Sequence, residues 1–248
     1  MFEDLLKYEK NKKITDEDIV EVKKIIAADK MKFTYFQLMH EKQNDFKDRE
    51  RFENMRFYYL NLNKIINYLQ VSFLNVYYYQ KIYNSISSRE KLYRLSDVVF
   101  YEELYFYYFF IMVDNIFKII DKTGILLNDC LNLEIKREDN KFNILLVKEM
   151  EKLKNDSTVE INNYLQYMSN YDGSTFDKMK RKYRNQNTHN FTSEVPKYRI
   201  VGDQITFDDN LKIDKTFEDL LSLLNELNKY IKLVDQVVIY SIKIQGCD

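Results

Sequence analysis

The most chemically informative residues of the chain are Arg184, Asn185 and His189, which form an Arg-Asn-x-x-x-His pattern. A histidine can accept or donate a proton near neutral pH. An arginine carries a permanent charge and a forked set of donors that fit phosphate oxygens. On a helix, Asn185 would lie one turn before His189, where its amide could hold the imidazole ring or a phosphate. These groups suit cleavage of RNA by its own 2′-hydroxyl, because that reaction needs a proton acceptor, a proton donor and stabilisation of charge on phosphorus.

A cluster of basic residues leads into this pattern. Five of the seven residues 178–184 are Lys or Arg, although the whole chain has a formal net charge of -1. Such a cluster can attract an RNA backbone whatever its base sequence. We therefore expect RNA-binding residues here, although a solvated helix face explains the same charges equally well. The candidates are Lys178, Lys180, Arg181 and Lys182.

Other residues that commonly do chemistry are few and scattered. His40 lies in an aromatic amphipathic segment, where we expect a structural role. Cys130 and Cys247 lack the spacing of a metal site, and the chain has no glycine-rich phosphate loop. We therefore expect no metal and no cofactor, and two free thiols in a reducing, cytoplasmic compartment. No apolar run has the character of a signal peptide or the length of a membrane span, so we expect no membrane partner.

The Arg-Asn-x-x-x-His pattern, followed by Asn190-Phe191 late in a helical chain, resembles the signature of the HEPN superfamily. That signature is Arg, then Asn, Asp or His, three variable residues and His. Arg184, Asn185 and His189 match it at every position. The resemblance implies an all-helical domain, and many members are metal-independent endoribonucleases of toxin–antitoxin, abortive-infection and CRISPR systems. It also implies a homodimer with a composite active site at the interface.

A line of polar residues marks the most apolar predicted helix, 95–122. The polar positions recur at helical spacing and would share one face of this helix. Members of the HEPN superfamily often carry a polar residue on a neighbouring helix that orients the motif, so Asp114 is the first candidate for that role and Glu103 the second. A solvent-facing helix edge explains the pattern equally well. The line consists of Glu103, Tyr107, Asp114, Lys118 and Asp121.

Four glycines and one proline in 248 residues favour long helices joined by polar connections, because tight turns draw on both residue types. Thr15 and Ser174 are predicted to begin helices, and Gly124 is predicted to end one as a left-handed cap. Short β-type runs around Gly202-Asp203 predict a small hairpin at 197–207. Apolar periodicity predicts helices at about 16–28, 33–39, 48–86, 95–122, 143–154, 158–168, 174–189 and 215–242.

The predicted fold class is all-α, a multi-helix bundle of HEPN type with the small β-hairpin inserted before the C-terminal helix. No repeat, linker or change of composition divides the chain, so residues 1–248 are predicted to form a single HEPN-like helical domain. Residues 1–50 and the hairpin at 197–207 are elaborations that the core pattern does not explain. The helix 95–122 looks too apolar for a surface position, and the need to cover it is one reason to expect a homodimer. The other reason is that one well-placed histidine per chain is too few for a two-histidine acid–base pair, which a twofold interface would supply.

Two functions remain open from the sequence. The first is a metal-independent endoribonuclease with Arg184, Asn185, His189 and Asp114 as catalytic residues and RNA as substrate. It would act as a toxin or antiphage-defence effector, with a cognate antitoxin or regulatory protein as a further partner. The second is a catalytically silent HEPN helical module that binds nucleotide, RNA or a protein partner through the same cleft. The intact Arg184 and His189 favour the enzyme, because a pure binding module need not keep both.

Overall fold

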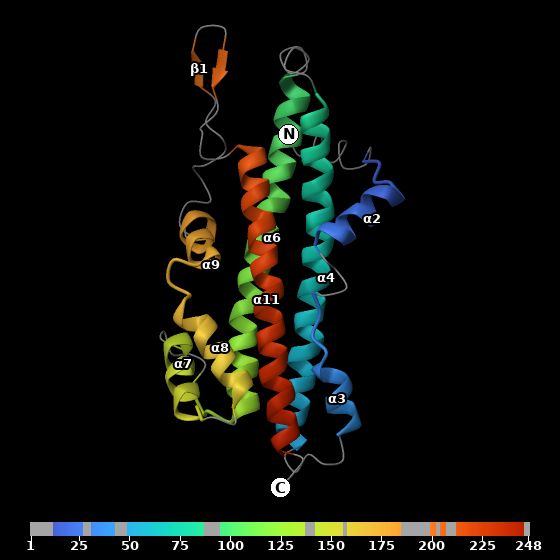
Figure 1. Ribbon diagram of the computed structural model, residues 1–248. Helices are drawn as coiled ribbons and strands as arrows, with labels where there is room; N and C mark the ends of the chain where they lie inside the picture. The colour runs from blue at the N-terminus through green and yellow to red at the C-terminus, as the bar shows by residue number, and fades with distance from the viewer. Residues whose placement is uncertain are drawn as a thin grey trace. The chain divides into compact units, whose positions relative to one another are not determined.

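A computed structural model gives the fold of the chain (Figure 1). Helices make up nearly all of its regular structure, which confirms the all-α prediction. Three of these helices are long: α4 (Arg49–Ser85), α6 (Leu95–Leu131) and α11 (Ile213–Gln245). The structure describes residues 12–26, 31–42, 49–86, 95–136, 142–155, 158–184, 199–201, 204–206 and 212–245.

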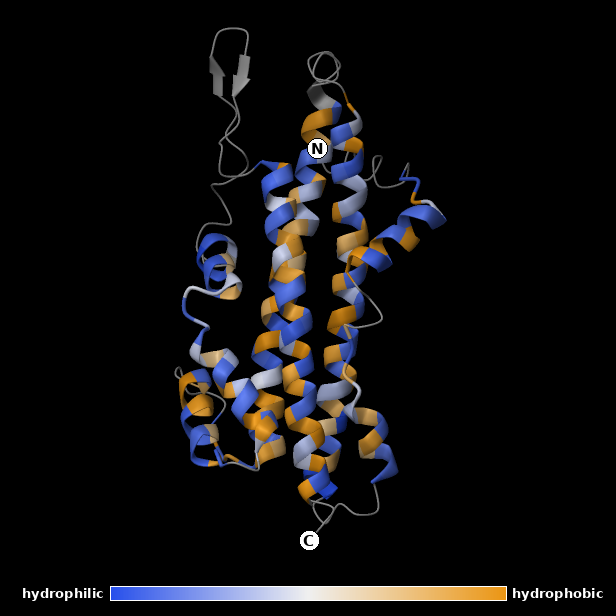
Figure 2. Cartoon of the chain, in the orientation of Figure 1, coloured by the Kyte–Doolittle hydropathy of each residue, from blue (hydrophilic) through white to orange (hydrophobic). Residues whose placement is uncertain are grey.

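The long helices form because their apolar residues recur with the period of an α-helix. Figure 2 shows apolar bands alternating with hydrophilic ones along α4, α6 and α11. On α4 the buried positions follow one another at spacings of three and four residues, which places them on one face. Each large apolar side chain that is fully buried in this way contributes about 2 kcal/mol of transfer free energy. The series includes Met55, Tyr58, Leu62, Ile66, Leu69 and Phe73.

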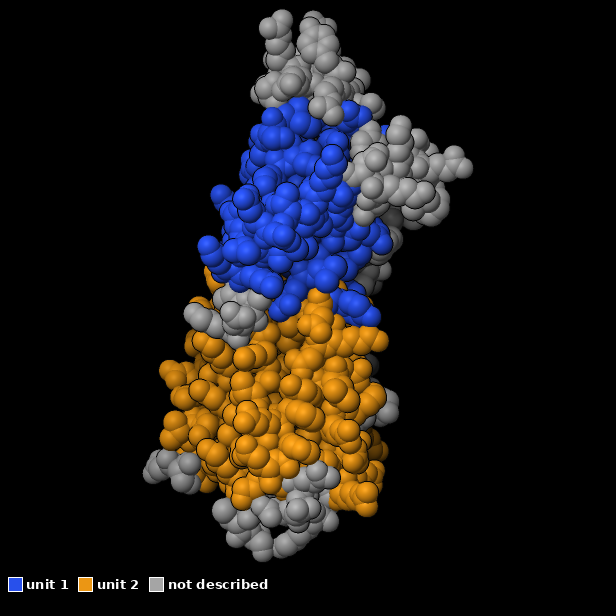
Figure 3. Space-filling model, turned by 90° about the vertical axis from the view of Figure 1, so that its right-hand side faces the viewer, with its two compact units in different colours: residues 1–28, 68–114, 179–224 blue, residues 29–67, 115–178, 225–248 orange. Residues whose placement is uncertain are grey.

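The chain divides into two compact units, each assembled from three separate segments (Figure 3). Each of the three long helices contributes to both units, so neither unit corresponds to a continuous stretch of sequence. This is why composition along the chain shows no boundary. Unit 1 comprises residues 1–28, 68–114 and 179–224, and unit 2 comprises residues 29–67, 115–178 and 225–248.

In unit 1, the short helix α2 (Asp16–Ile25) is fixed at its first turn. The sequence predicts a helix start at Thr15, and there Thr15 and Asp18 form a reciprocal capping box, with each side chain accepting from the backbone N–H of the other. The buried Asp18 carboxylate also accepts from the Lys81 ammonium of α4 at 2.6 Å. The start of α2 is therefore tied to α4 by an ion pair with one buried partner.

The segment before α2 is held by aromatic rings of the same unit. The Lys12 ammonium lies 5.3–5.9 Å from the ring centroids of Tyr78, Tyr79 and Tyr108. It also donates to the side-chain oxygen of Asn75. A cation over several aromatic faces is attracted to each ring. Lys12 thereby links the start of the described chain to both α4 and α6.

In unit 2, a carboxylate of α11 caps the helix α3 (Tyr35–Glu41). Asp235 Oδ1 accepts from the backbone N–H groups of Thr34 and Tyr35 at 2.8 and 3.0 Å, and its other oxygen accepts from the Thr34 hydroxyl. Burial raises the pKa of Asp235, although these hydrogen bonds act in the opposite direction. The first N–H groups of a helix have no intrahelical partner, so Asp235 supplies the hydrogen-bond acceptor for the first turn of α3. His40 lies in the last turn of α3 and is exposed.

The prediction that Gly124 ends the helix 95–122 is wrong. The helix α6 continues to Leu131, because its buried apolar face carries on through Leu126, Leu127 and Cys130. A Cβ atom on Gly124 would lie 3.3 Å from side-chain atoms of Phe142 and Asn143, at the start of α7 (Phe142–Lys152). The glycine therefore permits the close approach of α7 to α6 within unit 2, and α8 (Val159–Ser169) follows α7.

The apolar character of α6 has a simple explanation. Among its large apolar side chains that the structure describes, Tyr107 is the only exposed one. The other described large apolar side chains of α6 are buried or half-buried, so the chain itself covers most of this helix. The apolar character of α6 therefore gives little support to a second subunit.

Among the described residues, two three-residue strands precede α11 in the chain. They are β1 (Arg199–Val201) and β2 (Gln204–Thr206), which pair antiparallel with Ile200 opposite Ile205 (Figure 1). These six residues are the part of 197–207 that the structure describes. Within the described ranges, no helix has the length and apolarity needed to cross a membrane.

Candidate functional site

The chain approaches the predicted motif through two consecutive helical elements, α9 (Thr175–Met179) and the π-helix η2 (Lys180–Arg184). Ser174 caps α9 as predicted, since its Oγ accepts from the Asp177 N–H at 3.2 Å, and Asp177 accepts in return from the Gly173 N–H at 3.0 Å. Gly173 has a φ of 79°, a left-handed conformation that favours glycine. The predicted helix 174–189 thus begins where expected but changes to π geometry before the motif. Single π-turns recur at functional sites.

Tyr183, the residue before Arg184, anchors η2 in unit 1. Its ring is 2% exposed and meets the ring of Phe109 on α6 edge to face, at 4.9 Å between centroids. Its hydroxyl donates to Oδ2 of Asp219 on α11 at 2.6 Å. Burial, and then the hydrogen bond to this carboxylate, raise the pKa of Tyr183 well above its ordinary value. The hydroxyl therefore stays protonated and remains a donor at physiological pH.

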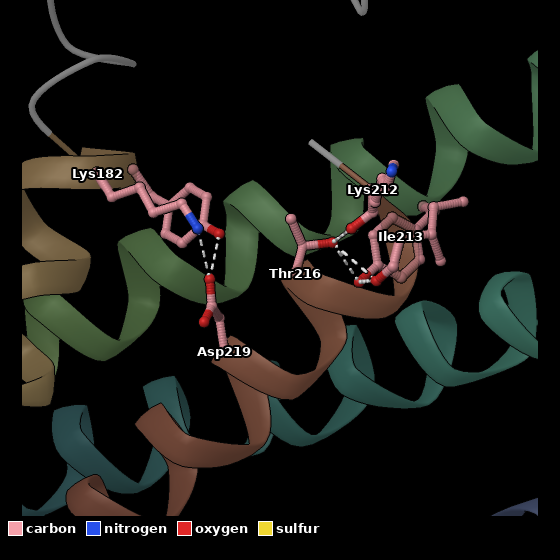
Figure 4. A network of polar contacts seen from close by, with 7 residues as sticks. Lys182, Lys212, Ile213, Thr216 and Asp219 are labelled. Carbon is pink, nitrogen blue, oxygen red and sulfur yellow. Dashed lines mark hydrogen bonds and ion pairs between the residues drawn. The ribbon is translucent and has the colours of Figure 1, made fainter. Parts of the chain in front are cut away.

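Lys182 shares this acceptor. Its ammonium lies 2.7 Å from the same Oδ2 of Asp219 and 4.8 Å from the ring centroid of Tyr183. Figure 4 shows the Lys182 side chain reaching the carboxylate of Asp219. Asp219 thus receives two donors from consecutive residues, which ties η2 to α11.

A second group of polar contacts fixes the beginning of α11. The Tyr105 hydroxyl on α6 donates to the Ile213 carbonyl at 3.1 Å and lies 3.0 Å from Thr216 Oγ1 (Figure 4). The ring of Tyr105 stacks with that of Phe109 at 6.2 Å between centroids. Because Phe109 also contacts Tyr183, the start of α11, this turn of α6 and η2 form one packed group within unit 1.

The four predicted RNA-binding residues differ in their surroundings. Lys178 and Arg181 are exposed and Lys180 is half-buried. Lys182 is engaged by Asp219, which lies 37 residues further along the chain. No local pattern of the sequence indicates that partner.

The motif begins where the described segment ends. Arg184 is the last residue of η2, whereas Asn185 and His189 lie outside the described residues. The contacts of these three side chains with one another and with RNA stay predictions from the sequence.

Asp114, predicted to orient the motif, is exposed on α6. It follows Phe109 by five residues, a rotation of about 140° around a helix, so it faces away from the side of α6 that contacts Tyr183. Tyr107 and Lys118 are exposed as well, which is the pattern of a solvent-facing edge. Glu103 is half-buried, and burial raises its pKa. A contact of Asp114 or Glu103 with the motif stays a prediction.

The buried acid on α6 is the neighbour of Glu103. Glu102 is 3% exposed and precedes Phe109 by seven residues, hence it shares the inward face of the helix. Burial, followed by the charges of Glu102 and Asp214, raises the pKa of Tyr83 to about 12. The seven-residue spacing was the signal in the sequence that could have identified Glu102. Within the described part of the chain, no three His, Cys, Asp or Glu side chains gather as a metal site would require.

Comparison with protein-family models matches residues 58–242 to the Cthe2314-like HEPN family. The matched range begins in α4, includes η2 and the motif, and ends in α11. Comparisons with curated proteins and with solved structures found no match. The family model covers well over half of the 248 residues, and it agrees with the motif and with the helical fold. On this evidence the chain belongs to the HEPN superfamily, in its Cthe2314-like family.

Proposed function

We propose that this chain is a metal-independent endoribonuclease that acts as a toxin or antiphage-defence effector. A HEPN domain suggests either a nuclease or a nucleotide-binding helical module. The observation that favours the nuclease is the intact set of Arg184, Asn185 and His189 inside the matched range. A cognate antitoxin or regulatory protein would control such an activity in the cell.

In the proposed reaction, the 2′-oxygen of RNA forms a bond to the adjacent phosphorus and the bond from phosphorus to the 5′-oxygen breaks. His189 serves as acid or base in moving the proton from the 2′-hydroxyl and delivering one to the 5′-oxygen. Arg184 binds the phosphate and stabilises the charge that develops on it. Asn185 orients the imidazole ring or the phosphate. The products are a 2′,3′-cyclic phosphate and a 5′-hydroxyl.

We propose that the working unit is a homodimer with a composite site. One chain offers a single histidine in the motif, and a twofold axis near it would bring a second His189 and a second Arg184 to the same phosphate. Lys178, Lys180 and Arg181 would attract the RNA backbone to this site.

The test is cleavage of RNA by the purified protein in excess chelator, with the ends of the products identified. The variants His189→Ala and Arg184→Ala should each lower the rate by about a hundredfold or more, the usual scale for a lost proton-transfer or charge-stabilising group. Neither should lower the melting temperature. His40→Ala is the matched control, because the other histidine of the chain is exposed on α3, and it should keep full activity.

Activity that disappears with chelator and returns with Mg²⁺ would contradict the mechanism. Binding of RNA or nucleotide without any cleavage would instead identify a silent module.

A further inference from the structure

We infer that Asp219 is a positioning residue for Arg184, the first residue of the motif, and acts on it through Tyr183. This inference rests on the proposed function, because it assigns a role within that site. Asp219 lies 35 residues beyond Arg184 on a different helix, and no part of the motif includes it.

The first argument is the geometry of the acceptor. A single oxygen, Asp219 Oδ2, accepts from the Tyr183 hydroxyl at 2.6 Å and from the Lys182 ammonium at 2.7 Å. Hydrogen bonds to a charged acceptor are short and strong, and two of them fix the rotamers of two consecutive residues. Lys182 also lies over the ring of Tyr183, so the three side chains brace one another.

The second argument is burial. The ring of Tyr183 is 2% exposed and packs against Phe109. The hydroxyl lies where the ring meets a partly exposed carboxylate, since the Asp219 side chain is 24% exposed. Without Asp219, the hydroxyl exchanges a charged acceptor on α11 for water, and η2 loses this attachment to α11.

The third argument is adjacency to the reaction. Tyr183 is covalently bonded to Arg184, and η2 ends at that arginine. A displacement of about 1 Å at a reacting group can cost on the order of a hundredfold in rate. The anchoring of Tyr183 therefore fixes the backbone position from which the Arg184 side chain extends. Asp219 itself touches neither substrate nor reacting atoms.

The same contacts predict the effect on RNA binding. The Lys182 ammonium is paired with the Asp219 carboxylate, so removing the carboxylate leaves this ammonium available to the RNA backbone. Loss of Asp219 should then lower kcat without raising KM. A purely structural defect would instead lower the melting temperature and the amount of active protein.

The experiment compares four variants with the wild type for kcat, KM and hydrogen exchange of the η2 amides. Asp219→Ala and Tyr183→Phe should each lower kcat by about tenfold or more and speed amide exchange in 180–184 to a similar degree. Asp219→Asn should keep much of the wild-type kcat and of the slow exchange of the η2 amides, because its amide oxygen still accepts from Tyr183. Glu218→Gln is the matched control, since this neighbouring acid of α11 is exposed, and it should change neither measurement.

Wild-type exchange of the η2 amides in Asp219→Ala would overturn the inference, whether or not the protein cleaves RNA. Wild-type kcat in that variant would also overturn it. If the wild type does not cleave RNA at all, the proposed function fails, and the exchange measurement alone decides whether Asp219 holds the start of the motif.

Discussion

Asp18 is a buried carboxylate whose charge stabilises the attachment of α2 in unit 1. The hydrogen bond from Lys81, followed by that from the Thr15 backbone, lowers the pKa of Asp18 below its ordinary value of 3.8. A group whose pKa is lower in the folded state stabilises that state above its unfolded pKa. The stabilisation is lost as the pH falls through the folded value. Asp18 should therefore contribute fully at neutral pH and cease to contribute in strong acid.

The variant Lys81→Met tests this expectation, because it removes the largest cause of the lowered pKa and leaves Asp18 in place. The free energy of unfolding should fall less between about pH 5 and about pH 2.5 in this variant than in the wild type. Urea unfolding followed by circular dichroism gives the free energy of unfolding of each protein at each pH. Equal losses in the two proteins would mean that the ion pair has no part in acid stability.

Single residues were predictable from the sequence only where their partners lie close by in the chain. The cap residues Thr15 and Ser174 bond to backbone three positions away, and both predictions are confirmed. Asp219 was missed because the groups that define its role come from a distant segment. Glu102 was missed although its seven-residue spacing from Phe109 places it on the inward face of α6. The motif residues were recognised by type and spacing, which the sequence contains in full.

At the scale of elements, the bounds of the long helices followed closely from apolar periodicity. The prediction 48–86 corresponds to α4 at Arg49–Ser85, and the prediction 215–242 lies within α11. The end of α6 was misjudged because a glycine inside a helix and a glycine after one look alike in sequence. What decides between them is the neighbouring helix α7, whose closeness to Gly124 is a tertiary contact.

Gly124→Ala distinguishes a glycine inside a helix from a left-handed cap. Alanine is favoured over glycine by about 1 kcal/mol in a helix interior. Its Cβ would lie 3.3 Å from Asn143, which is exposed, and from Phe142, which is half-buried, and both side chains can move slightly. The free energy of unfolding should therefore stay the same or rise by up to about 1 kcal/mol.

Gly124→Val is the companion variant and should lower the free energy of unfolding by about 1–3 kcal/mol, because its branched side chain needs more room than α7 leaves. A left-handed cap would instead lose about 1–2 kcal/mol with alanine. Chemical denaturation of both variants separates these cases, and an alanine variant clearly less stable than the wild type would contradict the helix-interior assignment.

At the scale of the whole molecule, the proposed homodimer depends on the chemistry of the motif. The apolar surface of α6 gives it little support, because the chain itself covers most of that helix. A composite site predicts that subunits with His189→Ala and subunits with Arg184→Ala interact when mixed. A mixed dimer keeps one intact histidine and one intact arginine, so its activity should exceed the mean of the two pure variants.

The control for this experiment is each variant mixed with itself under the same conditions. Sedimentation at the assay concentration measures whether dimers are present. Full activity in a sample that sediments as a monomer would rule out the composite site.

The division of each unit among three separated segments has a consequence for synthesis of the chain. The first turns of α11 belong to unit 1 and its remainder to unit 2, so the core of unit 1 is complete only once residue 224 has been made, and that of unit 2 only later. Until then, the apolar faces of α4 and α6 emerge without their third partner. A nascent chain with so much uncovered surface is a natural client for chaperones. For the same reason, no contiguous fragment of the gene would encode either unit as a free-standing protein.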